Sequence, residues 1–131
     1  MNPVFQVDGV AYNVTVPQGG LKRSGKVVDD EAASRAKSGG MKRSIIGTYY
    51  NYSMQIDTSE LNVADYDALF EVLTAPADYH TITVPYGQKT LTFRAYVANV
   101  DDELLLMQGN RNLWGNMAFN FIAMQPNRRP A

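Results

Sequence analysis

Hydrophobic and polar residues alternate along much of this chain in the manner of β-strands. The clearest run extends from Tyr50 to Ile56, in which every second residue is hydrophobic and the residues between them are polar. Such a period of two predicts a strand with one buried face. The whole strand is expected to cover Met41–Asp57, and bulky residues on both of its faces before Tyr50 suggest that its start is covered on both sides.

Other segments carry shorter strand patterns. A small hairpin is expected over Val4–Tyr12, because Asp8-Gly9 suits a two-residue turn in which both residues have positive φ. A second hairpin is expected to turn at Pro85-Tyr86-Gly87. Asp101–Asn112 is expected to be a connection, although it contains an apolar run. The further strands are expected at Leu21–Val28, His80–Val84, Gln88–Val100 and Trp114–Met124.

One segment has the period of a helix. Its hydrophobic residues recur at intervals of three and four, which places them on one face. Asn62 is a suitable N-cap, Asp65 suits the first turn, and Pro76 ends the segment. We therefore expect a helix over about residues 63–74. Its apolar stripe consists of Val63, Tyr66, Leu69, Phe70 and Leu73.

This order of elements predicts a mostly β protein of the α+β kind. We expect an antiparallel β-sandwich or half-open barrel with one flanking helix. With 131 residues, the chain is expected to form a single domain, 1–131. Residues 29–40 are polar and are expected to be a mobile loop, with a short helix possible over Asp30–Lys37. Residues 125–131 are expected to fray.

The distribution of charge is uneven. The net charge is −1. Residues 1–50 hold seven Lys and Arg against four acids, which gives +3, whereas residues 51–131 hold five against nine, which gives −4. Faces of opposite sign can meet when copies pack head to tail. There is no cysteine, and we expect neither a membrane span nor a signal peptide, so synthesis in a cytoplasm is expected.

The sequence offers little for catalysis or metal binding. His80 follows Asp78 and Tyr79, but no Ser or Cys lies in a nucleophile motif, so an ordinary histidine at the edge of a loop is expected. Asp101–Glu103 lacks the alternating pattern of a calcium loop, and Gly19-Gly20 lacks the rest of a phosphate loop. We therefore expect no enzyme activity, no cofactor and no metal.

Two binding functions stay open. A carbohydrate- or ligand-binding β module could use the tyrosines, Tyr49 and Tyr50 among them, as a stacking platform. A small nucleic-acid-binding protein is less favoured, because the basic residues of the N-terminal part are not interleaved with aromatic ones. Those basic residues are Lys22, Arg23, Lys26, Lys42 and Arg43.

Four motifs together resemble a known family. They are Ile46-Gly47 with Tyr50–Tyr52, the helix from Tyr66 to Pro76, the strand His80–Pro85, and the ending Phe121–Pro126. In this order they resemble small structural proteins of tailed bacteriophages and prophages. The order is also similar to the β-sandwich of tail-tube, distal-tail and secretion-tube proteins. Leu21–Gly40 has no counterpart in that pattern.

The resemblance implies a structural component of a phage or prophage tail: a tube, distal-tail or baseplate-associated protein. Such a protein acts by self-assembly into a ring or tube, a hexamer being one option, and by contacts with other tail proteins. It resides in the virion tail, after assembly in the cytoplasm of the bacterial host. The residues expected at the contact between copies are Lys22, Arg23, Asp29, Asp30, Arg35, Lys42, Arg43, Ile45 and Tyr49.

Overall fold

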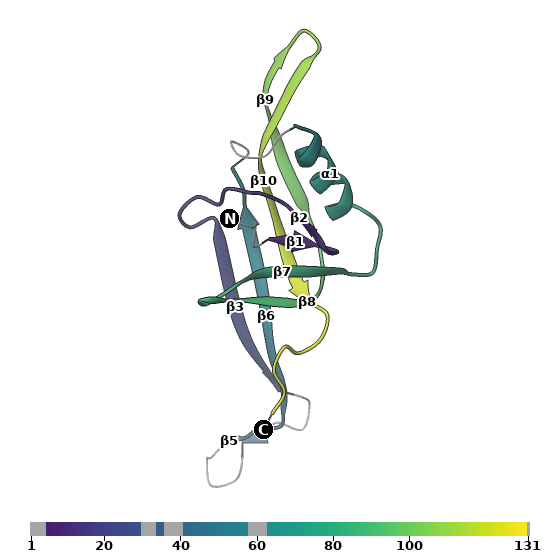
Figure 1. The fold of residues 1–131 in the computed structure, drawn as a ribbon. Coiled ribbons are helices and arrows are strands. Elements are labelled where there is room, and N and C mark those ends of the chain that lie inside the picture. Colours follow the sequence, from purple (N-terminus) through teal and green to yellow (C-terminus); the bar gives the residue numbers. More distant parts are fainter. Residues whose placement is uncertain (1–4, 30–33, 36–40, 58–62, 131) are drawn as a thin grey trace.

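In the computed structural model of the chain, alternating sequence patterns become one eight-stranded antiparallel sheet and a separate two-stranded sheet (Figure 1). The structure describes residues 5–29, 34, 35, 41–57 and 63–130. One helix, α1 (Val63–Leu73), accompanies the sheets. The large sheet contains β1 (Gln6–Val7), β2 (Val10–Ala11), β3 (Leu21–Asp29), β6 (Ile45–Gln55), β7 (His80–Tyr86), β8 (Lys89–Tyr96), β9 (Val100–Gln108) and β10 (Arg111–Ala123). The small sheet pairs β4 (Ser34–Arg35) with β5 (Met41–Lys42).

The thirteen-residue strand β10 joins two layers of the large sheet. Its residues 118–121 pair with β6, and β3 lies on the far side of β6. Its last residues, Ile122 and Ala123, pair with β8, which leads through β7 to β1 and β2. Figure 1 shows β7 and β8 lying across β3 and β6. The sheet does not close on itself, which confirms the expected antiparallel β-sandwich or half-open barrel with one helix.

The core lies between these two layers and beneath α1. Alternate residues of β10 point into it, as the period of two predicts. The helix contributes Tyr66, Leu69 and Leu73. The largest fully buried side chains of the described residues are Phe121, Ile56, Leu69, Ile82, Met117, Val7 and Val84.

Several local expectations are confirmed. Asp8 and Gly9 have φ of 53° and 83°, as the tight turn between β1 and β2 requires. The helix ends at Leu73, close to its expected end. Val63, however, is wrongly placed in the apolar stripe, because its side chain is 58% exposed at the start of the helix. The expected N-cap, Asn62, lies outside the described residues.

The expected connection over Asp101–Asn112 is wrong. Most of it is β9, which forms a hairpin with β10 around Gly109, whose φ is 59°. Gly109-Asn110 is a turn signal of the kind that joins two strands. The apolar run Leu104–Met107 hid the strand, because it does not alternate.

The region before β6 also differs from expectation. The long strand begins at Ile45, and Met41–Lys42 is a separate strand that pairs with Ser34–Arg35. This pairing replaces the short helix considered over Asp30–Lys37. Residues 30–33 and 36–40, the rest of the expected mobile loop, lie outside the described residues.

The C-terminal segment, for which composition predicts fraying, is hydrogen-bonded to β6. The N–H of Thr48 donates to the carbonyl of Arg128 at 2.8 Å, and the N–H of Arg128 donates back to the carbonyl of Thr48 at 3.2 Å. The side chain of Asn127 accepts a bond from the N–H of Tyr50 at 2.8 Å. The pairing of β6 with β10 ends at Tyr52. In the part of β6 before Tyr52, the C-terminal segment takes the place of β10, while β3 pairs with the other side.

This docking needs a glycine at position 47. A Cβ at Gly47 would collide with the carbonyl oxygen of Arg128 and would lie 2.7 Å from Cβ of Pro126. We expect Gly47→Ala to lower the free energy of unfolding by about 2 kcal/mol, because the tail must move away from β6. Urea unfolding measures the loss, and faster tryptic cleavage after Arg128 would report the release of the tail.

Gly25→Ala is the matched control for this prediction. Gly25 pairs with Tyr50 on the neighbouring strand, and its added Cβ would meet only the Tyr50 ring at 3.4 Å. Its effect should stay within about 0.5 kcal/mol. Equal stability of the two variants would contradict the proposed role of Gly47.

Candidate functional site

The outer edge of β3 is open along its length. β3 pairs with β6 on one side, and no strand of the described residues pairs with its other side. In an antiparallel pair, the backbone N–H and C=O groups of every second residue point to the neighbouring strand. The N–H of Gln55 donates to the carbonyl of Gly20, so the even-numbered residues of β3 direct their backbone groups toward β6. The N–H groups of Arg23, Gly25 and Val27 therefore point outward.

A second open edge belongs to β9. This strand pairs only with β10 among the described strands, and Glu103–Gln108 are all exposed. Beyond residue 118, β10 has β6 on its other side, but its first half has β9 alone. The β9–β10 hairpin therefore projects from the body of the molecule, as Figure 1 shows. Unpaired strand edges are templates for pairing with another chain.

The two edges carry opposite charges. β3 presents the exposed cations Lys22, Arg23 and Lys26. β9 presents Asp101 and Glu103 as exposed acids, and Asp102 half-buried beside them. The sequence predicted a basic first part and an acidic second part, and the fold places three of these basic residues on β3 and three of these acids on β9, the two outer strands of the layer β3-β6-β10-β9.

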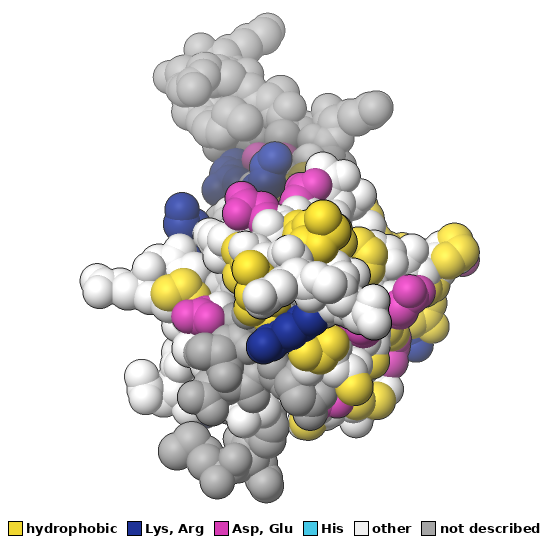
Figure 2. Space-filling view, turned by 90° about the horizontal axis from the view of Figure 1, so that it is seen from above, with side chains coloured by type: hydrophobic (Ala, Val, Ile, Leu, Met, Phe, Trp, Pro, Cys, Tyr) yellow, Lys and Arg dark blue, Asp and Glu magenta, His cyan; other side chains and the backbone are white. Residues whose placement is uncertain are grey.

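Hydrophobic side chains are exposed on the projecting hairpin. Met107 is 70% exposed, and Leu104, Leu105, Leu106 and Trp114 are each exposed as well. Figure 2 looks onto this end of the molecule and shows several hydrophobic side chains spread over it, with acidic ones among them and a basic one near the centre. A group of apolar side chains on a protruding hairpin is typical of a surface that another protein covers.

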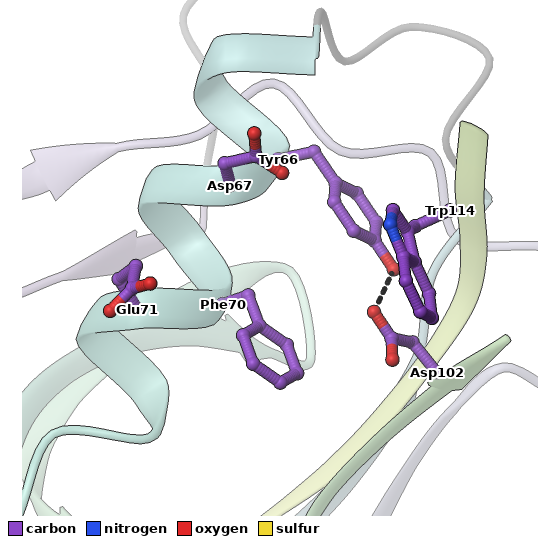
Figure 3. A pocket seen from close by; sticks show the side chains of 6 residues that line it. All are labelled: Tyr66, Asp67, Phe70, Glu71, Asp102 and Trp114. Carbon is purple, nitrogen blue, oxygen red and sulfur yellow. Dashed lines mark hydrogen bonds between the residues drawn. The ribbon is translucent and has the colours of Figure 1, made fainter. Parts of the chain in front are cut away.

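A pocket lies between α1 and the base of this hairpin (Figure 3). Its volume is about 290 Å³. The hydroxyl of Tyr66 donates to the carboxylate of Asp102 at 2.9 Å, and the ring of Trp114 lies beside that pair. Burial, and then this hydrogen bond, raise the pKa of Tyr66. The lining residues are Tyr66, Asp67, Phe70, Glu71, Asp102 and Trp114.

Four of the residues predicted at the contact between copies lie at the two ends of β3. Lys22 and Arg23 are exposed at its start, opposite Ser53 and Tyr52. At its far end, Arg43 pairs with Asp29 through bonds of 3.1 and 3.2 Å.

The remaining predicted residues have varied surroundings. Ile45 is exposed beside Asp29, and Tyr49 is half-buried. Arg35 and Lys42 belong to the small β4–β5 sheet, and their side chains lie outside the described part of the structure. Asp30 lies outside it entirely. The sequence reasoning missed the hairpin residues Leu104–Met107, for which the turn signal Gly109-Asn110 was available.

Tyr50 belongs to a cluster of side chains. The ring of Tyr50 packs against Tyr86 with centroids 5.2 Å apart, and the Tyr86 hydroxyl donates to that of Tyr50 at 3.1 Å. This bond is the main cause that lowers the pKa of Tyr50. The guanidinium of Arg23 lies 5.4 Å from the centre of the Tyr86 ring. The cluster thus occupies part of the Tyr50 ring surface on which a sugar would stack.

The sequence predicted an ordinary histidine at the edge of a loop, and this prediction is wrong for His80. It begins β7, is 3% exposed, and its Nδ1 lies 2.7 Å from a carboxylate oxygen of Asp8. Asp8 also accepts a bond from the N–H of Thr81 at 2.9 Å. Desolvation raises the pKa of Asp8, but the bonds with His80 and Thr81 outweigh it and hold that pKa below its ordinary value. The pair fastens the β1–β2 turn to β7.

Comparisons with known proteins place the chain in no family. No protein-family model matches it, and no curated protein is significantly similar to it in sequence. Among the described residues, no helix has the length and apolar character needed to span a membrane. Within the same residues, His, Asp and Glu side chains nowhere gather in groups of three or more that could hold a metal ion.

Asp8→Asn tests the clamp between the turn and β7. Asparagine keeps the shape and the turn geometry but removes the charge, so the free energy of unfolding should fall by about 1 kcal/mol at pH 5. Because the folded pKa of Asp8 is depressed, its contribution is present above the ordinary value of 3.8 and is lost as pH falls through the folded pKa. The difference between the two proteins should therefore shrink below pH 3.8.

Thermal unfolding of both proteins between pH 3 and pH 6 measures this difference. Asp78→Asn is the control, since Asp78 is an exposed carboxylate close to His80 in sequence. It should leave stability unchanged. A constant difference between the Asp8→Asn and unsubstituted proteins across this range would contradict a role for the charge.

Proposed function

We propose that this protein is a structural subunit that assembles with copies of itself by pairing the β3 edge of one copy with the β9 edge of the next. The observation that carries the proposal is the pair of open edges at opposite sides of one layer, β3-β6-β10-β9. The contact uses two different surfaces of each copy. Such heterologous contacts produce rings when the rotation closes and tubes or filaments when it does not.

Strand directions support this mode of assembly. Every neighbouring pair in the layer is antiparallel, so β3 and β9 run in opposite directions. Copies related by rotation about an axis along the strands keep those directions. The β3 strand of one copy then meets the β9 strand of the next in antiparallel order, and the sheet continues without interruption.

The side chains favour the same partner. The cations of β3 would face the acids of β9, which favours this pairing over β3 with β3 or β9 with β9. The apolar residues of the hairpin would be covered by the neighbouring copy. Backbone hydrogen bonds would contribute affinity, and the charges would select the edge.

Within this class, we propose a component of a phage or prophage tail: a tube, distal-tail or baseplate-associated protein. The support is the resemblance of the four sequence motifs, together with the half-open β fold and its single helix. Mass spectrometry of tail particles purified from a host that carries the gene tests this assignment. Assembled particles that lack the protein would contradict it.

Gly25→Pro tests the use of the β3 edge. Gly25 is exposed and its N–H points away from β6, so proline removes an outward donor and leaves the bonds to β6 intact. We expect self-association to weaken by at least about tenfold, which corresponds to roughly 1.4 kcal/mol. Sedimentation equilibrium over a range of protein concentrations measures the change, and circular dichroism checks the fold.

Leu105→Glu with Met107→Glu tests the hairpin. Both residues are exposed on β9, so the folded subunit should be as stable as before, whereas assembly should fail because charge replaces the apolar contact. Val63→Glu is the matched control, since it replaces an exposed apolar residue on α1 with the same charge. Its assembly should be unchanged. Unsubstituted protein that stays monomeric at high concentration in light scattering and negative-stain images would overturn the proposed function.

A further inference from the structure

The pocket beside Asp102 lies on the surface that the next copy would approach. Asp102 belongs to β9, and α1 lies alongside the base of the β9–β10 hairpin (Figure 1). In Figure 3 the rings of Tyr66, Phe70 and Trp114 and the carboxylate of Asp102 surround one space. Asp67 and Glu71 of α1 also line the pocket, and Figure 3 shows Glu71 at its margin, on the side of the helix away from Asp102. The pocket thus combines three aromatic rings with three carboxylates. This combination suits a cation with a flat or apolar body.

Strand parity determines which cation of a neighbouring β3 strand would face this pocket. Arg23 pairs with the buried Tyr52 and therefore lies on the inner face of the layer. Val100 of β9 pairs with the buried Phe119 and therefore also lies on the inner face. Asp102 follows it by two residues in the same strand, so it lies on that face too. Lys22 and Lys26 point to the opposite face. Arg23 is consequently the cation that β3 presents on the side of the pocket.

One register of the antiparallel contact matches both charges and apolar residues. Placing Arg23 of one copy opposite Asp102 of the next also places Lys22 opposite Glu103 and Leu21 opposite Leu104. A shift by two residues in either direction leaves one opposite-charge pair directly across the contact instead of two. Directly opposed charges of unlike sign stabilise a strand pair, so this register is the favoured one.

We propose that the pocket formed by Tyr66, Phe70, Asp102 and Trp114 receives the Arg23 guanidinium of a second copy, an inference that rests on the proposed assembly. The planar guanidinium can stack on the aromatic rings and donate to Asp102 while Asp67 and Glu71 lie close by. Within one copy the guanidinium of Arg23 lies 5.4 Å from the centre of the Tyr86 ring, and no ion pair of the described residues includes it. Its charge is therefore not neutralised within the copy, and the guanidinium would exchange the Tyr86 ring for the rings of the neighbour's pocket.

The first test measures self-association of the full chain. We expect Arg23→Glu to weaken assembly by about tenfold, because it places a carboxylate among the acids of the pocket. Glu71→Arg should weaken it to a similar degree, and the double variant Arg23→Glu with Glu71→Arg should recover most of the loss. Lys89→Glu, which makes the same charge change at an exposed residue of the β7–β8 hairpin, should have no effect.

The second test examines the pocket without relying on assembly. The chain contains a single tryptophan, Trp114, so its fluorescence reports on the pocket directly. The host is the full chain with Gly25→Pro, whose own edge is blocked where it would face β9. A peptide with the sequence of residues 19–26 should change the fluorescence in a saturable manner. The change should be absent when norleucine replaces the peptide's arginine, and when the host also carries Glu71→Arg.

The two tests separate the two proposals. If Gly25→Pro abolishes assembly but Arg23→Glu does not, and the peptide fails to bind, the pocket proposal is wrong and the proposed assembly stands. If the unsubstituted chain is monomeric but the peptide binds through its arginine, the pocket is a receptor for this segment and the assembly proposal is wrong. Binding of the norleucine peptide with unchanged affinity would overturn the role of Arg23.

Discussion

The structure depends on the way a single strand, β10, divides its hydrogen bonds. Its C-terminal half lies between β6 on one side and β8 and β9 on the other, whereas its N-terminal half has β9 alone. The alternation that buries Met117, Phe119 and Phe121 anchors the first of these regions in the core. The ladder shifts near Asn116, which has a φ of 55°, and there the hairpin leaves the body. The two layers and the projecting arm are therefore consequences of the same strand.

This division explains why the described part of the protein exposes an apolar hairpin and unpaired strand edges. A two-stranded ribbon has little stability of its own, and the apolar residues of the projecting hairpin gain nothing from the core of their own subunit. An edge strand of this kind is a hazard unless it is short, charged or covered. Here β3 is charged and β9 is charged only at its base, so the two edges differ. In the proposed assembly, this difference would discourage pairing of like with like and would favour the pairing of β3 with β9.

The sequence predicted the parts of the fold that local patterns encode. The period of two in Tyr50–Ile56 and the turn at Asp8-Gly9 were sufficient for a strand and a hairpin, and the stripe through Tyr66, Leu69 and Leu73 was sufficient for the helix. The strand over Leu104–Met107 was missed because a ribbon exposed on both faces needs no alternation.

Other features depend on residues far apart in the chain. Asp8 and His80 are 72 residues apart, and Asn127 is 77 residues from Tyr50, so no local pattern connects them. The pocket likewise requires α1, β9 and β10 to meet. The sequence showed an excess of positive charge in one part and of negative charge in the other, but it could not show that the fold would carry these charges to opposite edges of one layer.

That placement determines what the charges can do. Salt largely screens the interaction between exposed charges that are more than about 10 Å apart, and exposed ion pairs contribute little affinity by themselves. Charged side chains instead determine the specificity of strand pairing. A strand edge can pair with any other edge through its backbone, and only side chains distinguish correct partners and registers. In the proposed assembly, a shallow row of charges would select the β9 edge over another β3, whereas a guanidinium held among aromatic rings would select one register, since a shift by two residues removes it from the pocket. Backbone hydrogen bonds and apolar contacts on the hairpin would then supply the stability that neither charged feature provides.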